Sequence, residues 1–244
     1  MNSICNGAFT SLGARKTLAT DADQFVAEQA FTNHVPTAET FAYRVVKRAF
    51  ELLCVLAMTP AILPLVVIIC IVIRCTSPGP VFYSHPRLRR NGETFRVWKF
   101  RTMHTDSDTI LKEHFHNNPR AQQEWSMTQK LRHDPRVTVV GHALRRYSLD
   151  ELPQLWNVLN GTMSLVGPRP ITTSEIEKYG EDFSTYCTVN PGLTGLWQIS
   201  GRCELSYPER VKLDVEYIHF WSLLVDLSIL AKTAHIVISG RGAY

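Results

Sequence analysis

The longest stretch of apolar side chains in the chain runs from residue 49 to residue 73 and reads AFELLCVLAMTPAILPLVVIICIVI. It holds 25 residues and one charge, Glu51, near its start. Roughly 20 consecutive apolar residues are enough for a helix to cross the hydrocarbon core of a bilayer. The core helix of a soluble domain would keep a polar stripe for solvent, and this stretch has none. The pattern therefore predicts a helix inserted in a membrane.

Prolines and flanking charges argue against a straight crossing. Thr59-Pro60 and Pro64 lie near the middle of the run, and a proline removes a helical hydrogen bond and bends or breaks the helix. Cationic flanks favour the cytoplasmic side of a membrane, and here both ends carry them. The flanking cations are Arg44, Lys47, Arg48, Arg74, Arg87, Arg89 and Arg90. We expect a re-entrant helical hairpin or a strongly bent helix, with both ends on one side.

Polar and apolar positions alternate on either side of Asn91-Gly92, in VFYSHPRLR and TFRVWKFR. Asn-Gly between two such runs predicts a β-hairpin, although His85-Pro86 should break the first run. Residues 104–130 are polar with weak helical character, and RVTVVGHALRRYS predicts a short strand leading into a helix or turn. Residues 164–170 predict an extended piece ending in a stiff loop.

The last part of the chain carries a helix-start signal and a second apolar stretch. Ser206 and Glu209 have the spacing of a capping box, which predicts a helix through about Phe220. Residues 221–238 are apolar but include Asp226, Lys232 and His235, so a core or interfacial helix fits better than a membrane span. The first forty residues lack an apolar core and predict a disordered N-terminal tail.

Charge changes this picture more than overall composition does. The net charge is only +4, but residues 44–101 hold ten Lys or Arg against two acids, Glu51 and Glu93. This excess indicates an anionic partner such as lipid head groups, phosphorylated substrates or nucleic acid. Nucleic acid is the weakest of these, because much of the charge flanks an apolar run.

Six cysteines without C-x-x-C spacing predict a reducing compartment, no disulfides and no zinc site. The common phosphate-loop, dinucleotide and zinc-protease motifs are absent from the sequence. His114 and His116 are the closest histidine pair, and their polar surroundings indicate surface side chains rather than catalysts.

The candidate chemistry lies in SLDELPQLWNVLNGTMSLVGPRP, residues 148–170, where Asp150 and Glu151 are adjacent carboxylates. One interpretation is a helix cap, with Ser148 and Glu151 as a capping box, and with both carboxylates ionised at the positive end of a helix. Pro153 complicates that register, and a start at Asp150 would place this proline within the first turn. A cap accounts for one carboxylate and is worth about 1 kcal/mol.

The other interpretation is phosphoryl transfer. Adjacent helical side chains point roughly 100° apart, so two neighbouring carboxylates suit two tasks, attack on phosphorus and cation binding. A carboxylate that attacks an anionic phosphate needs arginines and a divalent metal to reduce the repulsion. Arg169 lies between Pro168 and Pro170 on a stiff backbone, which suits a guanidinium that binds phosphate in a fixed geometry. Spacing alone leaves the two interpretations open.

From about Tyr43 to Tyr244 the chain resembles the bacterial sugar transferase family, the monotopic polyprenyl-phosphate phosphoglycosyl transferases. The similarity covers most of the chain in the family order and is far more specific than any single motif. The segments that carry it are KRAFELL, SPGPVFY, NGETFRVWKFRTM, SLDELPQLWNVLNGTMSLVGPRP, NPGLTGLWQISGR and GRGAY.

The resemblance implies a two-step reaction. Asp150 would attack the β-phosphate of a UDP-sugar and release UMP, and a polyprenyl phosphate such as undecaprenyl phosphate would then take the phosphosugar from the enzyme. Glu151 would bind Mg²⁺, and Arg145 and Arg169 would bind phosphate. Lys99, in the segment KFRTM, is a weaker candidate for the same site. Thr59-Pro60 matches the break in the family's re-entrant membrane helix.

The implied architecture is a mixed, helix-rich α/β fold on a monotopic membrane protein of the compact, exopolysaccharide-initiating type. We expect a tail over residues 1–40, a re-entrant membrane helix over 41–78 and a cytoplasmic catalytic domain with interfacial helices over 79–244. The protein would lie at the bacterial inner membrane, in contact with lipid. A homo-oligomer, and a non-catalytic tether that recruits polysaccharide-assembly proteins, remain alternatives.

Two departures from the family pattern lie outside the dyad. Leu88-Arg89 replaces a common Val-Gly pair, and Val139 stands where many members have arginine. Glucose, galactose and N-acetylated sugars differ at one or two hydroxyls, and no residue here can be assigned to read them.

Overall fold

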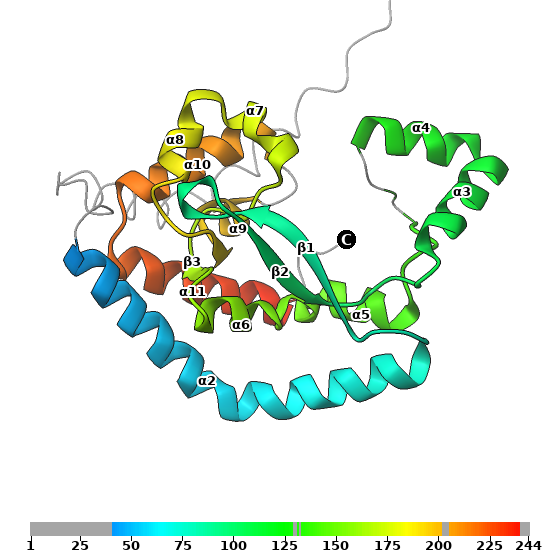
Figure 1. Cartoon of the computed structure of the whole chain (residues 1–244), viewed down its shortest axis with the longest axis horizontal. Coiled ribbons are helices and arrows are strands. Elements are labelled where there is room, and N and C mark those ends of the chain that lie inside the picture. The colour runs from blue at the N-terminus through cyan, green and yellow to red at the C-terminus, as the bar shows by residue number, and fades with distance from the viewer. Residues whose placement is uncertain (1–40, 129–130, 132, 202–204, 240–244) are drawn as a thin grey trace, which may run out of the picture. The chain divides into compact units, whose positions relative to one another are not determined.

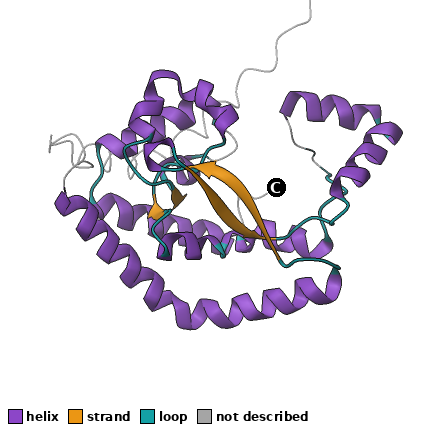
Figure 2. Ribbon diagram, in the orientation of Figure 1, coloured by secondary structure: helices purple, strands orange, loops and turns teal. Residues whose placement is uncertain are grey.

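The computed structural model describes residues 41–128, 131, 133–201 and 205–239, which all belong to one compact unit, Thr37–Tyr244. Helices dominate this unit, and its strands form two small two-stranded sheets (Figures 1 and 2). The predicted mixed, helix-rich fold class is therefore confirmed. The predicted tail over residues 1–40 lies outside the described residues.

The α-helices of the described residues are α2 (Phe41–Thr76), α3 (Ser107–Asn117), α4 (Pro119–Thr128), α5 (Val139–Arg146), α6 (Gln154–Leu159), α7 (Ile176–Tyr179), α8 (Phe183–Tyr186), α9 (Leu196–Ser200), α10 (Tyr207–His219) and α11 (Leu223–Ser239).

Helix α2 contains the whole apolar run. The segment Arg44–Thr76 is long and apolar enough to cross a membrane, and only 11% of its most apolar window is buried. The helix continues through Thr59 and Pro60, and Figure 1 shows a change of direction near its middle, where both prolines lie. Thr59 Oγ1 donates a hydrogen bond to the Val55 carbonyl at 2.8 Å, an arrangement that often bends helices. Helix α2 is therefore one continuous helix that changes direction near its middle, and the re-entrant arrangement stays a prediction.

The predicted hairpin is confirmed. Strands β1 (Phe82–Leu88) and β2 (Thr94–Phe100) pair antiparallel, joined by the short 3₁₀ helix η2 (Arg90–Gly92). Asn91 and Gly92 have φ values of 63° and 71°, the left-handed region that Asn-Gly favours. The break expected at His85-Pro86 is wrong, because Pro86 pairs with Arg96 inside β1. A two-stranded sheet has only edge strands, so the missing proline N–H can face outward.

The second sheet is short and brings together segments far apart in sequence. Strands β3 (Ser164–Val166) and β4 (Gly192–Thr194) pair parallel, as the extended piece at residue 164 predicts for β3. Gly167 N donates to the Thr194 carbonyl at 2.9 Å, and a Cβ atom on Gly167 would lie 2.8 Å from the Asn190 carbonyl oxygen. Glycine therefore permits the close approach that fixes the start of the Pro168-Arg169-Pro170 loop.

Helix starts are partly as predicted. Ser206 and Glu209 form the predicted capping box at the start of α10. The strand expected before residue 139 is reduced to one bridge between Met103 and Val137, after which Thr138 caps α5 by accepting a hydrogen bond from Gly141 N at 2.9 Å. The cysteines at 54, 70, 75 and 187 are free thiols, and the other two lie outside the described residues.

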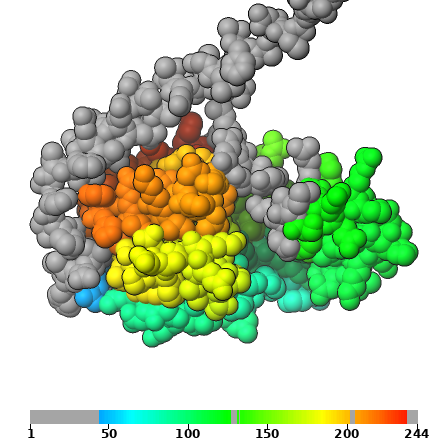
Figure 3. All heavy atoms as spheres, turned by 90° about the horizontal axis from the view of Figure 1, so that it is seen from above, coloured from blue at the N-terminus to red at the C-terminus, as the bar shows by residue number. Residues whose placement is uncertain are grey.

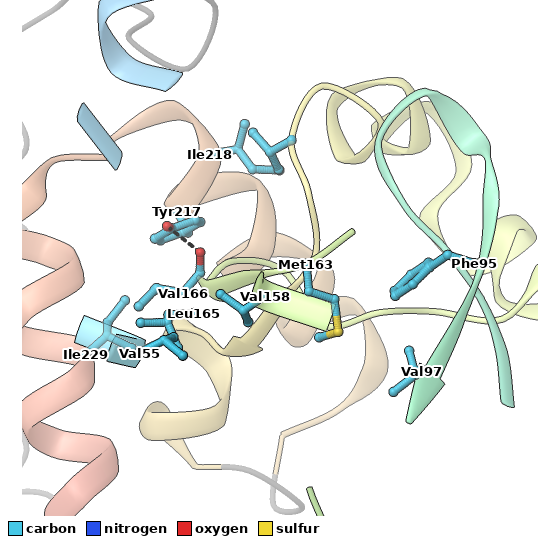
Figure 4. Close-up of a cluster of buried hydrophobic side chains, with 11 residues drawn as sticks. Val55, Phe95, Val97, Val158, Met163, Leu165, Val166, Tyr217, Ile218 and Ile229 are labelled. Atoms are coloured by element: carbon cyan, nitrogen blue, oxygen red, sulfur yellow. Dashed lines mark hydrogen bonds between the residues drawn. The ribbon is translucent and has the colours of Figure 1, made fainter. Parts of the chain in front are cut away.

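The main core joins α2, β2, α6, β3, α10 and α11. Buried side chains from these elements include Val55, Val97, Val158 and Ile229 (Figure 4). A second cluster packs α10 against the short helices α7 and α8, which lie side by side with it in Figure 3 as orange and yellow segments. The 3₁₀ helix η4 (Thr173–Glu175) leads into α7, and the 3₁₀ helix η5 (Gly180–Asp182) connects α7 to α8. The membrane-type helix is thus packed directly onto the core that carries the second sheet.

Candidate active site

The adjacent carboxylates Asp150 and Glu151 lie in a 3₁₀ turn, η3 (Leu149–Glu151), between α5 and α6. Ser148 has φ 54° and ψ 22°, in the left-handed region, and its side chain makes no capping hydrogen bond. Helix α6 begins at Gln154 with Pro153 at its N-cap position. Both capping registers are therefore wrong. The left-handed turn at Ser148 rules out the box, and Pro153 starts the helix only after both carboxylates.

Lys99 connects the hairpin to this turn. Its Nζ atom donates a hydrogen bond to Glu151 Oε1 at 2.6 Å and lies 3.7 Å from Asp150 Oδ2. The Asp150 side chain is 12% exposed, against 33% for Glu151 and 33% for Lys99. One cation thus serves two carboxylates, and the more buried carboxylate receives the weaker contact.

Burial dominates the electrostatics of Asp150. It raises the pKa of the carboxyl above the usual aspartate value, and the charge of Glu151 raises it further. Lys99 and Arg145 oppose this shift because a nearby cation favours the ionised form. A carboxylate with a raised pKa is more basic and hence a better nucleophile once ionised.

Arg145 approaches Asp150 from the end of α5. Its Nε donates to Thr102 Oγ1 at 2.9 Å, which anchors the side chain to the segment after β2. Burial lowers the pKa of the guanidinium, while Asp150 and Asp134 raise it. Asp150 therefore has cations from two directions, Lys99 from the hairpin and Arg145 from the preceding helix.

Arg169 leaves the β3–β4 sheet in the stiff loop. Pro168 is fully buried and Arg169 is exposed. The Arg169 guanidinium lies 5.6 Å from the centre of the Trp197 ring, and Arg210 lies 5.0 Å from the same ring. A cation over an aromatic face is held in place without being neutralised.

One pocket brings several predicted residues together. Lys99, Glu151, Arg169 and Pro170 all line it, so residues from β2, η3 and the loop after β3 meet there. Asp150 and Arg145 do not line the pocket, but Asp150 contacts Lys99, which does, and the charge of Arg145 acts on Asp150. Thr59 and Pro60 lie in α2, apart from the pocket. The remaining lining residues are His85, Arg87, Val97, Gln154, Gly192, Leu193 and Gln198.

Asn157, which sequence reasoning missed, fixes the turn with the dyad relative to the hairpin. It is 2% exposed. Its Oδ1 accepts from Trp98 N at 3.1 Å, and its Nδ2 donates to the Arg96 carbonyl at 2.8 Å. The side-chain amide thus makes the two backbone hydrogen bonds that a neighbouring strand would make with β2, and it fixes α6 against that strand. The available signal was a single asparagine at a core position of an apolar helix.

A buried ion network, also missed, ties α2 to the catalytic core. Lys47 Nζ lies 2.6 Å from Asp226 Oδ2 and 3.0 Å from Glu51 Oε1. Glu51 Oε1 accepts from Leu165 N at 3.0 Å. The Tyr217 hydroxyl lies 2.8 Å from Asp226 Oδ1 and 3.0 Å from the Val166 carbonyl oxygen, and Figure 4 shows the second of these contacts. Charges inside apolar stretches were the signal, because a buried charge needs a partner.

Within the described residues, no group of three or more His, Cys, Asp or Glu side chains is placed to hold a metal. Asp150 and Glu151 offer two adjacent carboxylates at the edge of a cationic pocket. Mg²⁺ is usually bound by one or two carboxylates together with substrate phosphates and water, rather than by an all-protein cage. The donor set therefore fits Mg²⁺ bound jointly with a phosphorylated substrate.

Comparison with known proteins places this site in a family context. The family model described as bacterial sugar transferase matches residues 42–240. The exopolysaccharide production protein ExoY of Sinorhizobium fredii is 48% identical over 198 residues, covering 81% of this chain and 88% of that protein. The UDP-galactose-lipid carrier transferase of Erwinia amylovora is 45% identical over 201 residues, covering 82% of this chain and 42% of that protein. The undecaprenyl-phosphate glucose phosphotransferase of Komagataeibacter xylinus is 38% identical over 209 residues, covering 81% and 37%.

Proposed function

This chain belongs to the bacterial sugar transferase family, and we propose that it moves a hexose-1-phosphate from a UDP-sugar to undecaprenyl phosphate. The chain is a transferase, as its relatives are. The substrate classes are taken from the names of relatives. One name mentions UDP-galactose and a lipid carrier, and two others mention undecaprenyl phosphate together with galactose or glucose. The match to an exopolysaccharide production protein supports a role at the first membrane step of exopolysaccharide or glycan synthesis.

The observation that carries this proposal is the buried carboxylate of Asp150 beside Lys99 at the edge of the cationic pocket. An oxygen of Asp150 attacks the β-phosphorus of the donor, and the bond from that phosphorus to the bridging oxygen breaks. UMP leaves with the bond's electron pair, and the phosphosugar stays on Asp150. An oxygen of the polyprenyl phosphate then attacks the same phosphorus, and the bond to Asp150 breaks, which restores the carboxylate.

The contacts of the dyad support Asp150 rather than Glu151 as the nucleophile. Glu151 forms the short hydrogen bond to Lys99, whereas Asp150 lies 3.7 Å from the same ammonium and is more basic because it is buried. A strong hydrogen bond to an ammonium lowers the nucleophilicity of the carboxylate oxygen that accepts it. Glu151 is left to bind the cation and to hold Lys99 in position.

Cations from three elements offset the repulsion between a carboxylate and a phosphate. Lys99 comes from β2, Arg145 from α5 and Arg169 from the loop after β3. Charges aimed at the site in advance cost no reorganisation when negative charge develops on the phosphate oxygens. Mg²⁺ held by Glu151 and the diphosphate would supply further charge neutralisation when bound.

The apolar surface of α2 supports a membrane location. Its large exposed side chains include Leu53, Leu56, Leu63 and Ile68. Such a surface is unfavourable in water and favourable in a bilayer. Positive charges at both ends support the cytoplasmic face of the bacterial inner membrane for the catalytic part, with α2 entering and leaving on that side.

UMP release tests the proposal. Detergent-purified protein is mixed with undecaprenyl phosphate and Mg²⁺ and assayed across a panel of UDP-sugars. We expect release with one or a few sugars, and its loss after EDTA treatment or in Asp150→Asn. The matched control is Asp108→Asn, an exposed aspartate of α3, which should retain activity. A folded protein that releases no UMP with any sugar would contradict the proposal and favour the non-catalytic tether.

A further inference from the structure

One face of the β1–β2 hairpin carries Arg87, a cation that the proposed mechanism does not use, on the same side as Lys99. Lys99 pairs with Tyr83, Val97 with His85, and Phe95 with Arg87. Side chains alternate along a strand and paired residues share a face, so these six side chains lie on the same face. Phe95 and Val97 cover the core (Figure 4). His85, Arg87 and Lys99 line the pocket that Glu151 and Arg169 also line.

Arg87 has the surroundings expected of an anion-binding side chain. Its side chain is half-buried, and its Nη1 donates to the Pro86 carbonyl at 2.9 Å and contacts His85 Nδ1. Burial lowers the pKa of the guanidinium, the charge of Glu175 raises it, and that of Arg169 lowers it. Within the described part of the chain, neither Arg87 nor Arg169 forms an ion pair with a carboxylate. Two guanidinium groups that repel each other in one pocket are stabilised when an anion binds between them.

The register separates Arg87 from the dyad. Lys99, which contacts Glu151, lies opposite Tyr83, and Arg87 is four residues further along β1. Four residues of strand correspond to about 13 Å. The hairpin therefore presents one cation at the dyad and a second toward the other end of the pocket. A diphosphate has two linked anionic groups and can offer one to each of these long cationic side chains, whereas a single phosphate has one group to offer.

We propose that Arg87, together with Arg169, binds the phosphate that remains with the nucleoside when the donor's diphosphate is cleaved. This inference rests on the proposed function. It adds Arg87 to the site and states which end of the donor's diphosphate lies near that residue. Asp150 and Lys99 face the phosphorus under attack, and Arg87 faces the leaving group. Breaking the bond to the bridging oxygen places additional negative charge on the leaving phosphate, and a guanidinium fork stabilises that charge through two parallel hydrogen bonds.

The same hairpin supplies a matched control. Arg96 pairs with Pro86, is exposed, and lies on the face opposite to Arg87, where its Nη1 donates to Ser84 Oγ at 2.9 Å. Arg87→Gln and Arg96→Gln therefore remove the same charge from the same hairpin, on opposite faces. Binding of UMP, UDP and inorganic pyrophosphate is measured by calorimetry on the full-length, detergent-solubilised protein with Mg²⁺ present.

We expect Arg87→Gln to weaken UMP and UDP binding at least tenfold, while Arg96→Gln stays within twofold of the wild type. UMP binding within twofold of the wild type in Arg87→Gln would overturn the inference and leave the proposed function standing. Weaker UDP and pyrophosphate binding with unchanged UMP binding would also overturn it, because Arg87 would then face the other phosphate.

A substitute variant and the ligand profile of the wild type complete the test. If Arg87→Gln does not fold, Arg87→Lys replaces it, and we expect at least threefold weaker UMP binding because an ammonium lacks the guanidinium fork. Wild-type UMP affinity in Arg87→Lys would overturn the inference. A folded wild-type protein that binds none of the three ligands would contradict the proposed function and this inference together. If the wild-type protein binds pyrophosphate but neither UDP nor UMP, the assignment of Arg87 to the phosphate that stays with the nucleoside is overturned, although a diphosphate site remains.

Discussion

Lys99 Nζ lies 2.6 Å from Glu151 Oε1, which joins the second strand of the hairpin directly to the turn that carries the dyad. The same ammonium lies 3.7 Å from Asp150 Oδ2. The position of the hairpin therefore sets the charge around both carboxylates. Asn157 fixes that position from the other side, through two hydrogen bonds to the backbone of β2.

Lys99→Met should move the acid limb of the pH–activity profile to higher pH. Burial raises the pKa of Asp150 and Lys99 lowers it, so removing Lys99 raises this pKa further. Asp150 must be ionised to attack, and activity is therefore lost at a higher pH as the solution is acidified. The measurement is kcat/KM for UMP release between pH 5 and 9, with the exposed Lys112→Met as control. An unchanged acid limb, or one at lower pH, would show that Lys99 does not act on the ionisation of Asp150.

Asn157→Ala should destabilise the protein by about 2 to 4 kcal/mol, because it leaves the part-buried Trp98 N–H and Arg96 carbonyl without their partner. Asn160→Ala is the matched control. Asn160 is exposed and accepts only from Thr162, so its loss should cost less than about 1 kcal/mol. Equilibrium unfolding in detergent measures both. Equal effects in the two variants would remove Asn157 from its proposed role as the clamp between α6 and the hairpin.

Lys47→Met should lower the free energy of unfolding by about 3 to 5 kcal/mol, since it leaves Glu51 and Asp226 buried without their shared cation. Lys112→Met, on the surface of α3, should change stability little. The same unfolding measurement compares them. A stable Lys47→Met protein would mean that α2 is not tied to the core through this network.

Reporters placed before Arg44 and after Pro80 should both be cytoplasmic. The apolar run has cations on both sides, and α2 bends where its two prolines lie (Figure 1). Accessibility of single cysteines to an impermeant thiol reagent in intact cells provides the measurement. Reporters on opposite sides would establish a spanning helix and contradict the re-entrant arrangement.

Local sequence signals predicted the elements that depend on local chemistry. Asn91-Gly92 between alternating runs predicted the hairpin, and Ser206 with Glu209 predicted the start of α10. The break expected at Pro86 failed, since an edge strand tolerates a missing donor. The capping box that was one of two interpretations at Ser148 is absent too. The left-handed conformation of Ser148 depends on how α5 and the turn pack, and the S-x-x-E spacing carries no information about that packing.

The site itself was only partly predictable. The residues themselves indicated Asp150, Glu151 and Arg169, and the family resemblance added Arg145 and Lys99. The structure gathers Lys99, Glu151 and Arg169 around one pocket. The contribution of Arg87 depends on strand register and on the β3–β4 pairing, which joins residues about 28 positions apart. No window of sequence shows such a relationship. Asn157 was missed for the same reason, because its partners lie on β2.

The most direct test of the central claim is transfer of labelled phosphosugar from the UDP-sugar to the protein in the absence of polyprenyl phosphate. We predict a covalent label on the wild-type protein that maps to the peptide containing Asp150 and disappears when undecaprenyl phosphate is added. Asp150→Asn should carry no label, and Asp108→Asn should carry the wild-type amount. Label on a folded Asp150→Asn protein, or UMP release by the wild type without any covalent label, would contradict Asp150 as the nucleophile.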